Sequence, residues 1–485
     1  MKKNIKVIGS GFSSLAGACY LAKAGHQVTV YEKNTTIGGR ARQLKRDGFT
    51  FDIGPTWYWM PDVFERFFAD FGKKPSDYYE LKKLSPAYQV YFGIDEFVLI
   101  SDNLEEIKAT FETIEKGSGK ALQDFMDEAR SNYDIAIKAL VSRPGVSPME
   151  LITVETAMKV GQFFGNISKN VRKKFKNQKL VQILEFPVLF LGAKPSDTPS
   201  FYNFMNYADF GLGTWHPKNG MYSVIKAIEK LAVELGVAIK TDSNISKVIV
   251  EGNEAKGLLV NNEFVQADIV LSGADYHHTE TLLDEKHRAY SEKYWESRVF
   301  APSSLLFYVG FDKKIVNVEH HSLFFDVDFD VHASDIYDNP KWPENPLFYA
   351  SFPSKTDSNS APEGKESAIF LIPLAPGIED TEALRNQYFE KIVTRLERLT
   401  QQNLKENIIF KESFCKNDFV EQYNSYKGNA YGMANTLLQT AFLRPKLKSK
   451  KVKHLYFTGQ LTVPGPGVPP ALISGKLVAE LIEKH

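Results

Sequence analysis

The residues whose chemical use is clearest lie near the start of the chain, within NIKVIGSGFSSLAGACYLAKAGHQVTVYEKN. Gly9 can form a tight turn and Gly11 can let the backbone approach a pyrophosphate, which the N-terminus of a following helix would stabilise. Glu32 can accept hydrogen bonds from ribose hydroxyls, and we include the adjacent Lys33 in the predicted site. Ser14 occupies the third glycine position of this fingerprint, where a small side chain still allows a helix to pack on a strand. The pattern predicts a dinucleotide site.

A second group of potential phosphate ligands follows in TTIGGRARQLKRDGFTFDIGPTWYW. Gly38 and Gly39 can expose backbone N–H groups, and Arg40 adds a guanidinium that suits an anion. Proteins that bind NAD do not ordinarily need this additional segment. Its presence therefore distinguishes the predicted site from an ordinary NAD site.

The elements that must position these residues can be predicted from the residue pattern. Residues 5–8 are apolar or alternating, residues 15–24 are rich in helix formers and end at Gly25, and residues 28–31 are β-branched and aromatic. A structural glycine turn is the alternative for the glycines alone. The order strand, helix, strand, followed by Glu32, favours the dinucleotide site.

Two later parts of the chain predict further sheets. A helix from about 222 to 235 is followed by two β-rich runs that end near Val250, and ADIVLSGADYHHT adds another strand and a turn. Between about 294 and 410, strand-like segments alternate with polar loops, which predicts a second, mixed sheet over a cavity. The fold class that we predict is α/β.

The segment from about 102 to 179 is helical and polar, and it ends in basic residues before an apolar run. That run, Phe186 to Ala193, is too short to cross a bilayer. It could lie on a membrane surface with the basic residues on lipid headgroups, or it could be a core segment that follows a solvated helix. The basic residues are Arg172, Lys173, Lys174, Lys176 and Lys179.

The composition argues against several classes of protein. Lys+Arg and Asp+Glu number 59 each, and the formal net charge of +0 provides no field that would attract nucleic acid. Runs of roughly 18 apolar residues are absent from the sequence, and the N-terminus lacks the apolar region of a signal peptide. We therefore expect a cytoplasmic protein without a spanning helix. Its two cysteines, Cys19 and Cys415, fit a reducing compartment.

Several other motifs do not support a metal or hydrolytic site. EKGSGKA lacks the first glycine and the Ser/Thr of a P-loop. The pairs His277-His278 and His320-His321 lack the helical spacing or cysteine partners of a zinc site, so we expect no metal. Because no nucleophile motif of recognised spacing is present, we name no catalytic side chain, and a bound cofactor would carry the chemistry.

Three consecutive aromatic residues, Trp57, Tyr58 and Trp59, follow a Gly-Pro turn. Alternate rings of such a run can line an apolar pocket beside a cofactor, so the three are our candidate substrate contacts. Ordinary core packing is the alternative for any one ring.

Both ends of the chain resemble one group of flavoproteins. The fingerprint, the acid after the second strand, GGR and the segment FDIGPT at 51–56 resemble the amine oxidase and phytoene desaturase superfamily. HLYFTGQLTVPGPGVPPALISGKLVAE resembles the signature that closes bacterial-type phytoene desaturases. The chain departs from that signature at Leu461-Thr462-Val463, where the family commonly has a small residue, Thr and His. Substrate or position of reaction could therefore differ.

The resemblance implies FAD as the cofactor, in a discontinuous, Rossmann-like domain of the GR2 type. That domain would comprise residues 1–80, 216–290 and 412–485, beside a mixed-sheet substrate-binding domain of residues 81–101, 194–215 and 291–411 and a helical subdomain of residues 102–193. Val248 would contact the adenine end, and Val468 and Pro469 would lie against the isoalloxazine. The implied FAD contacts, besides the N-terminal glycines, Glu32 and Arg40, are Gly54, Pro55, Thr56, Val248, Gly459, Gln460, Val468 and Pro469.

The activity that the resemblance implies is desaturation of a carotenoid: a hydride leaves an allylic carbon for flavin N5, a proton leaves the neighbouring carbon, and conjugation lengthens. We expect phytoene to lycopene; a hydroxycarotenoid 3,4-desaturase, an isomerase or a ketolase is the alternative. GDP-dissociation inhibitors share the resemblance and bind prenylated proteins without flavin, but the GxG, Glu32 and GGR argue against that role. Because a long polyene would not cross free water, we expect peripheral membrane binding through the 172–193 segment.

Overall fold

The computed structural model describes residues 2–151, 156 and 158–484. The N-terminal fingerprint lies on a parallel sheet with the strand order β19, β13, β1, β2, β9. In this order β1 is central, because Ile5 pairs with Ile269 on one side and with Val28 on the other. The strands are β1 (Asn4–Ile8), β2 (Gln27–Tyr31), β9 (Ala238–Lys240), β13 (Ile269–Ser272) and β19 (Leu455–Phe457).

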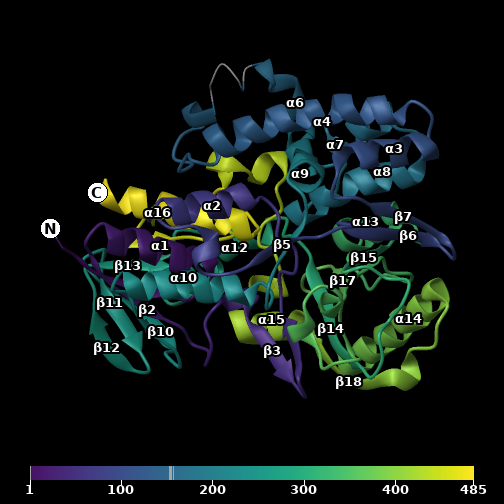
Figure 1. The fold of residues 1–485 in the computed structure, drawn as a ribbon. Coiled ribbons are helices and arrows are strands. Elements are labelled where there is room, and N and C mark those ends of the chain that lie inside the picture. Colours follow the sequence, from purple (N-terminus) through teal and green to yellow (C-terminus); the bar gives the residue numbers. More distant parts are fainter. Residues whose placement is uncertain (1, 152–155, 157, 485) are drawn as a thin grey trace.

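Three separate segments of the chain build this sheet, as the predicted discontinuous arrangement requires. The helix α1 (Phe12–Lys23) packs on β1 and β2 and also contacts α10 (Tyr222–Glu234) and α16 (Val468–Glu483) (Figure 1). Gly475 permits the close approach of α16 to α1, since a Cβ at this position would lie 2.6 Å from the carbonyl oxygen of Ser13. The first and last helices of the chain are therefore packed side by side.

A small antiparallel sheet lies beside the parallel one (Figure 1). Its strands are β10 (Ile245–Glu251), β11 (Glu254–Val260) and β12 (Glu263–Gln266). The pairing of β10 with β11 shifts register twice, once just after Ile245.

The predicted second sheet is present and has seven strands in the order β18, β14, β17, β16, β15, β6, β7. It is mixed, because β15 pairs with β6 in parallel and the other neighbours are antiparallel. One face packs on α14 (Glu382–Thr400) through Phe307, Phe389 and their neighbours. The strands are β6 (Tyr88–Gly93), β7 (Glu96–Ile100), β14 (Ser303–Phe311), β15 (His321–Phe324), β16 (Phe348–Ser351), β17 (Glu366–Leu374) and β18 (Ile408–Phe414).

A helical layer covers one end of the molecule, in blue at the top of Figure 1. Phe111, Phe125 and Phe175 are buried at its centre. Phe201 and Phe204 belong to the same core, so the 200–211 segment packs with the helices and not with the mixed sheet to which we assigned it. The helices are α3 (Leu104–Ile114), α4 (Ser118–Ile135), α6 (Val160–Phe164), α7 (Ile167–Lys174), α8 (Gln178–Glu185) and α9 (Phe204–Asn206).

The membrane element predicted at 172–193 stays a prediction, and the described side chains of its apolar run argue against it. Phe186, Val188 and Ala193 are buried, at 4%, 0% and 1% exposure, so these side chains cannot dip into lipid. Three of the basic residues form ion pairs within the protein, where Arg172 meets Glu185, Lys174 meets Glu128 and Lys179 meets Glu96. An apolar run behind a basic helix suits a protein core as well as a membrane, and here Phe186, Val188 and Ala193 lie in the core. Within the described part of the chain, no helix combines the length and apolar character needed to cross a bilayer.

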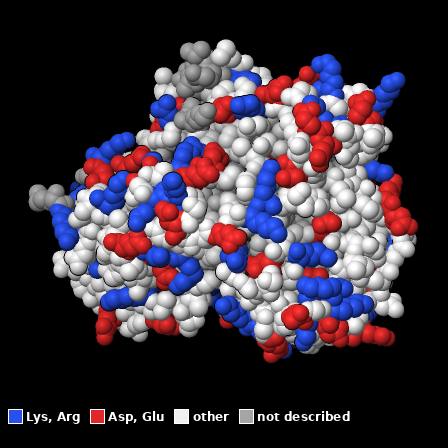
Figure 2. Space-filling model, viewed as in Figure 1, with Lys and Arg blue, Asp and Glu red and all other residues white. Residues whose placement is uncertain are grey.

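The remaining elements connect the three layers. Figure 2 shows cationic and anionic side chains interspersed over one face of the molecule, without a block of a single sign. The connecting elements are β3 (Gln43–Arg46), β4 (Phe49–Asp52), α2 (Pro61–Ala69), β5 (Leu81–Lys83), β8 (Trp215–Pro217), α11 (Tyr276–Thr281), α12 (Glu292–Glu296), α13 (Phe329–Tyr337) and α15 (Lys416–Tyr423).

Candidate functional site

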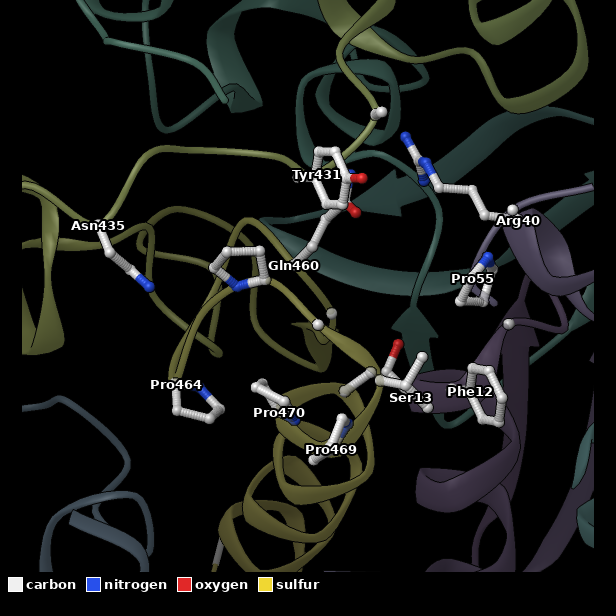
Figure 3. A pocket seen from close by; sticks show the side chains of 18 of the residues that line it. Phe12, Ser13, Arg40, Pro55, Tyr431, Asn435, Gln460, Pro464, Pro469 and Pro470 are labelled. Carbon is white, nitrogen blue, oxygen red and sulfur yellow. The ribbon is translucent and has the colours of Figure 1, made fainter. Parts of the chain in front are cut away.

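A single cavity of about 1000 Å³ runs between the parallel sheet, the mixed sheet and the helical layer. One end is lined by Gly9, Gly11 and Arg40, and the other by Phe163, Phe201 and Leu437. In Figure 3, Phe12 and Arg40 from the N-terminal segment and Pro464 and Pro469 from the C-terminal segment surround the same space. The two motif-bearing ends of the chain therefore contribute to one site.

The glycines of the fingerprint form a turn that leaves room for a ligand. Gly9 has a φ of +84°, which favours glycine, and its N–H donates to the carbonyl of Tyr31 at 2.8 Å. A Cβ at Gly11, the residue before α1, would meet no atom within 4 Å. The backbone there is open to the cavity, and the N-terminus of α1 follows directly. This geometry fits the pyrophosphate of a dinucleotide.

The GGR segment lies against this turn. A Cβ on Gly39, whose φ is +56°, would be 3.4 Å from the Cα of Gly11, so the two glycine segments are in direct contact. The Arg40 guanidinium donates through Nη2 to the Ser425 hydroxyl at 3.0 Å and to the Asn429 carbonyl at 3.3 Å. Its buried Nε has no hydrogen-bond partner among the described residues. An unpaired cationic donor beside open backbone N–H groups is the arrangement that a phosphate anion would satisfy.

The carboxylate of Glu32 lines the cavity and is already held by neighbouring donors. Its Oε2 accepts from the Ser10 backbone at 3.1 Å and from the Ser10 hydroxyl at 2.7 Å. Its Oε1 accepts from the Asn34 backbone at 3.0 Å and side chain at 2.8 Å. A ribose hydroxyl would have to replace one of the two side-chain donors. Lys33, which also lines the cavity, donates to the carbonyl of Glu421 at 2.6 Å.

The proline- and glycine-rich segment before α16 forms the opposite wall. Gly459, Gln460, Val468 and Pro469 all line the cavity, as do Gly54, Pro55 and Thr56 on the N-terminal side. The Gly459 N–H donates to the Ser474 hydroxyl of α16 at 3.0 Å, and the Thr462 hydroxyl donates to the Gly459 carbonyl at 2.8 Å. The loop is thus tied to its own helix. Contacts of all these residues with a cofactor stay predictions.

Arg444 holds this segment from behind, a role that our sequence reasoning missed. Its side chain is 1% exposed and donates to the carbonyls of Gln460 at 3.1 Å and Met433 at 2.8 Å, and to the side chain of Asn435. Burial lowers the pKa of Arg444 to about 10, so it remains charged at neutral pH. Arg444 is visible in the sequence before Pro445, but its partners lie in two other segments, one at 433–435 and one at Gln460.

Two predicted cofactor residues do not line the cavity. Val248 is buried in the core of the β10–β12 sheet, and Ile245, three residues earlier, faces the cavity instead. Ser14 of α1 is buried against the turn that follows β13. A Cβ on Gly273, in that turn, would lie 2.0 Å from the Ser14 hydroxyl oxygen. Ser14 therefore serves helix–strand packing, the role expected of the third glycine position.

The aromatic run alternates as predicted, with one of its three residues outside the cavity. Trp57 and Trp59 line the cavity. Tyr58 faces the core, where its ring stacks on Phe64 with a centroid distance of 4.2 Å and its hydroxyl bonds to that of Tyr79 at 2.7 Å. The candidate substrate contacts are therefore the two tryptophans, and Tyr58 is a core residue.

The far end of the cavity is mostly apolar and was not predicted from the sequence. Its walls come from segments that are distant in the chain, so no local motif marks them. Residues that line it include Ile137, Phe163, Phe186, Leu189, Phe201, Phe204, Leu323, Phe348, Tyr349, Leu371, Leu437 and Leu438. This chamber suits a long hydrocarbon better than a polar substrate.

Ionisable groups are concentrated at the end of the cavity that Gly9, Gly11, Gly39 and Arg40 line, which we call the cradle. Burial raises the pKa of Asp275, and the nearby Arg40 guanidinium opposes this shift. Burial lowers the pKa of His278 to about 4, so its ring is neutral at neutral pH. Among the described residues, no group of three or more His, Cys, Asp or Glu side chains is placed to hold a metal ion.

Comparisons with known proteins agree with this geometry. The family model described as flavin containing amine oxidoreductase matches residues 13–483. A carotenoid 3,4-desaturase of Haloarcula japonica is 40% identical over 487 residues, 99% of this chain and 98% of that protein. A 4,4'-diapophytoene desaturase (4,4'-diaponeurosporene-forming) of Staphylococcus haemolyticus is 32% identical over 494 residues, with 98% of each chain covered.

Solved structures share the fold at much lower identity. The RAB GDI of Plasmodium falciparum matches with a TM-score of 0.58 and 10% identity, covering 100% of this chain and 98% of that one. At that identity the likeness concerns the fold alone. It adds no support to a role without flavin.

Proposed function

Since the chain belongs to the flavin containing amine oxidoreductase family, we propose that it desaturates a carotenoid held in the apolar chamber beside its cofactor. It is an FAD-dependent oxidoreductase. The observation that carries the proposal is the continuity of the cavity, in which a cradle for a dinucleotide opens into a long apolar chamber. When bound, FAD supplies the two-electron acceptor that removal of a hydride from carbon requires.

The chain's own residues bind and orient the two reactants. Gly11, Gly39 and Arg40 would hold the pyrophosphate through backbone N–H groups and the guanidinium. The segment from Gly459 to Pro469, held by Arg444, lines the cavity opposite the N-terminal segment. Aromatic and aliphatic walls exclude water from the chamber, so an alkene chain can be held there without competing polar contacts.

For the position of reaction we propose the 3,4 bond of a carotenoid. The relative named for that reaction is 40% identical, against 32% for the diapophytoene desaturase. The Leu461-Thr462-Val463 departure, with Val463 lining the cavity, is compatible with a substrate other than phytoene. Conversion of phytoene to lycopene, which we expected from the sequence, becomes the second candidate.

The test is to supply FAD-loaded protein with liposomes that contain either phytoene or a conjugated carotenoid with a saturated 3,4 bond, and to follow the polyene absorption. A red shift with the conjugated carotenoid alone supports the 3,4 assignment. A new visible spectrum from phytoene supports the second candidate. Flavin-loaded protein that changes neither substrate would contradict the proposal of a carotenoid desaturase.

We also propose a location for the membrane contact that replaces the 172–193 segment. Phe164, Leu437, Leu438 and Leu443 line the cavity and are also 78%, 41%, 74% and 40% exposed. Side chains that are both cavity-lining and exposed mark a mouth, and we call these four the apolar rim. Exposed apolar side chains at the mouth of an apolar chamber are suited to a bilayer surface, from which a carotenoid could enter without crossing water.

A further inference from the structure

A second, smaller cavity of about 180 Å³ lies next to the main one, and Thr56 lines both. Polar residues, among them Asp52, His216 and His320, line the smaller cavity. Lys45 and Asn359, on its outer side, are exposed to solvent. The small cavity therefore lies between the substrate chamber and bulk water.

A hydrogen-bonded chain leads from the chamber wall toward this cavity. Tyr349 of β16 lines the chamber, and its hydroxyl lies 2.8 Å from the Thr56 hydroxyl and 2.7 Å from Nδ1 of His321. The His321 ring is fully buried and stacks on Trp57 with a centroid distance of 4.0 Å and an interplanar angle of 10°. The stacking fixes the imidazole so that Nδ1 faces the tyrosine.

Two further histidines continue from His321. Its ring centroid is 4.4 Å from that of His320, which in turn is 4.6 Å from that of His216. The Nε2 atom of His216 lies 3.7 Å from a carboxylate oxygen of Asp357. Nε2 of His321 and Nε2 of His216 are buried and have no hydrogen-bond partner among the described residues. His216 and His320 line the small cavity, whereas His321 lies behind His320, so a water in the cavity could bridge to the unpaired Nε2 of His216.

The charge state of His320 and His321 permits proton transfer. Burial lowers the pKa of both His320 and His321 well below the ordinary histidine value, and neighbouring rings, His216 among them, add to the shift. Lys82 is a further positive group that acts on His320. Both rings are therefore neutral at pH 7, and a neutral imidazole can accept a proton at one nitrogen and release one from the other.

We propose that Tyr349, His321 and the small polar cavity form a proton path from the substrate chamber to solvent. The path rests on the proposed desaturation, in which two C–H bonds break and one C=C π bond forms. One hydrogen leaves with its electron pair to the two-electron acceptor, so the carotenoid is oxidised and the acceptor reduced, and the second leaves as a proton. That proton has to leave an apolar chamber. The Tyr349 hydroxyl can accept a proton from the chamber while it donates its own proton to Nδ1 of His321.

The alternative is that the histidines and Tyr349 only hold the strands together. Two variants distinguish these roles: Tyr349→Phe removes the hydroxyl and keeps the ring, and His321→Gln keeps a hydrogen-bonding group that cannot relay a proton. Tyr58→Phe is the matched control, because it removes a buried hydroxyl next to Trp57 that faces the core. Each variant is loaded with FAD and compared with the wild-type protein.

We expect kcat to fall roughly 100-fold in both path variants, with KM, flavin content and thermal stability unchanged, and no change in Tyr58→Phe. Free imidazole should restore part of the rate of His321→Ala. Rates within about twofold of wild type in both path variants would overturn the proposal. A rate loss matched by lower stability or weaker carotenoid binding would also overturn it, because a structural role predicts that pattern.

A measurement without substrate separates this proposal from the proposed function. In ¹⁵N-histidine-labelled, FAD-loaded protein, the His321 resonances, identified by their loss in His321→Gln, should report a neutral ring with its proton on Nε2. The Nδ1 resonance should move in Tyr349→Phe and stay unchanged in Tyr58→Phe. A His321 Nδ1 resonance that is the same in Tyr349→Phe and in the wild-type protein would overturn the path. Wild-type protein that is inactive on every carotenoid would instead overturn the proposed function.

Discussion

The two ends of the main cavity are built in different ways. At the cradle end, backbone N–H groups, glycines with positive φ and paired polar side chains such as Glu32 define the surface. At the chamber end, aromatic and aliphatic side chains from distant segments define it. The cradle depends on particular residue types at particular positions, whereas the chamber depends on the total shape and volume of its walls. Substitutions should therefore have different consequences at the two ends.

The largest effect should come from filling the cradle. In Gly11→Val, the new side chain enters space that no protein atom occupies, and the φ of −72° at Gly11 is ordinary, so the chain should still fold. The displaced ligand should lose about 3 kcal/mol, or roughly 100-fold in Kd for FAD. Flavin absorption after desalting and fluorescence titration of the flavin-free protein measure this loss.

The matched control is Gly161→Val in α6, another glycine at which a Cβ would meet no atom within 4 Å. It should retain FAD at the wild-type level. Equal flavin content in both variants would mean that the cradle is not where the cofactor binds.

The next effect should appear at the chamber end and leave the cradle untouched. The double variant Phe164→Glu, Leu438→Glu places two charges on the apolar rim, where the native side chains are 78% and 74% exposed. Loss of their apolar contact with lipid should cost about 2 kcal/mol, or roughly 30-fold in partitioning to liposomes. Flotation assays measure the partitioning, and flavin content should stay constant.

Phe264→Glu provides the control for this pair. Phe264 is 56% exposed on β12, beside the parallel sheet and away from the rim, so its replacement should leave partitioning unchanged. If it reduces liposome binding as much as the double variant does, membrane contact does not depend on the rim.

A smaller effect should separate two neighbouring arginines. Both arginines lie over the Tyr423 ring and have a buried Nε without a hydrogen-bond partner among the described residues, but only Arg40 lines the cavity. Arg40→Ala should therefore weaken FAD binding by about 1.5 kcal/mol, roughly tenfold, through loss of a charge-assisted hydrogen bond. Arg42→Ala should leave the Kd for FAD within about twofold of wild type. Similar losses in the two variants would assign the effect to long-range charge.

The same contrast explains how much could be predicted from the sequence. The turn at Gly9, the GGR segment and the Gly459–Pro469 wall could be predicted because each is specified by local residue types. Phe164 and Leu438 could not, because they meet only when segments far apart in the chain pack together. Phe186, Val188 and Ala193, which are buried, belong to a run that we assigned to a membrane because lipid and protein core both select apolar residues.

The errors around the aromatic run and the chamber wall have two other causes. Tyr58 and its two neighbours alternate, and period-two alternation alone does not tell which face is the cavity. His321 and Tyr349 lie on neighbouring strands of a sheet whose pairing is known only from the fold. Residues that come together only through the pairing of strands therefore cannot be predicted from single sequence motifs.

The smallest effect tests the register of β10. Ile245 faces the cavity and Val248 faces the core, so Ile245→Ala should weaken FAD binding by about 1 kcal/mol, roughly fivefold, with a small change in stability. Val248→Ala should lower the free energy of unfolding by about 2 kcal/mol and leave the Kd for FAD unchanged. Titration with FAD and thermal unfolding of the flavin-free proteins measure the two quantities. The opposite pattern would restore Val248 as the adenine contact.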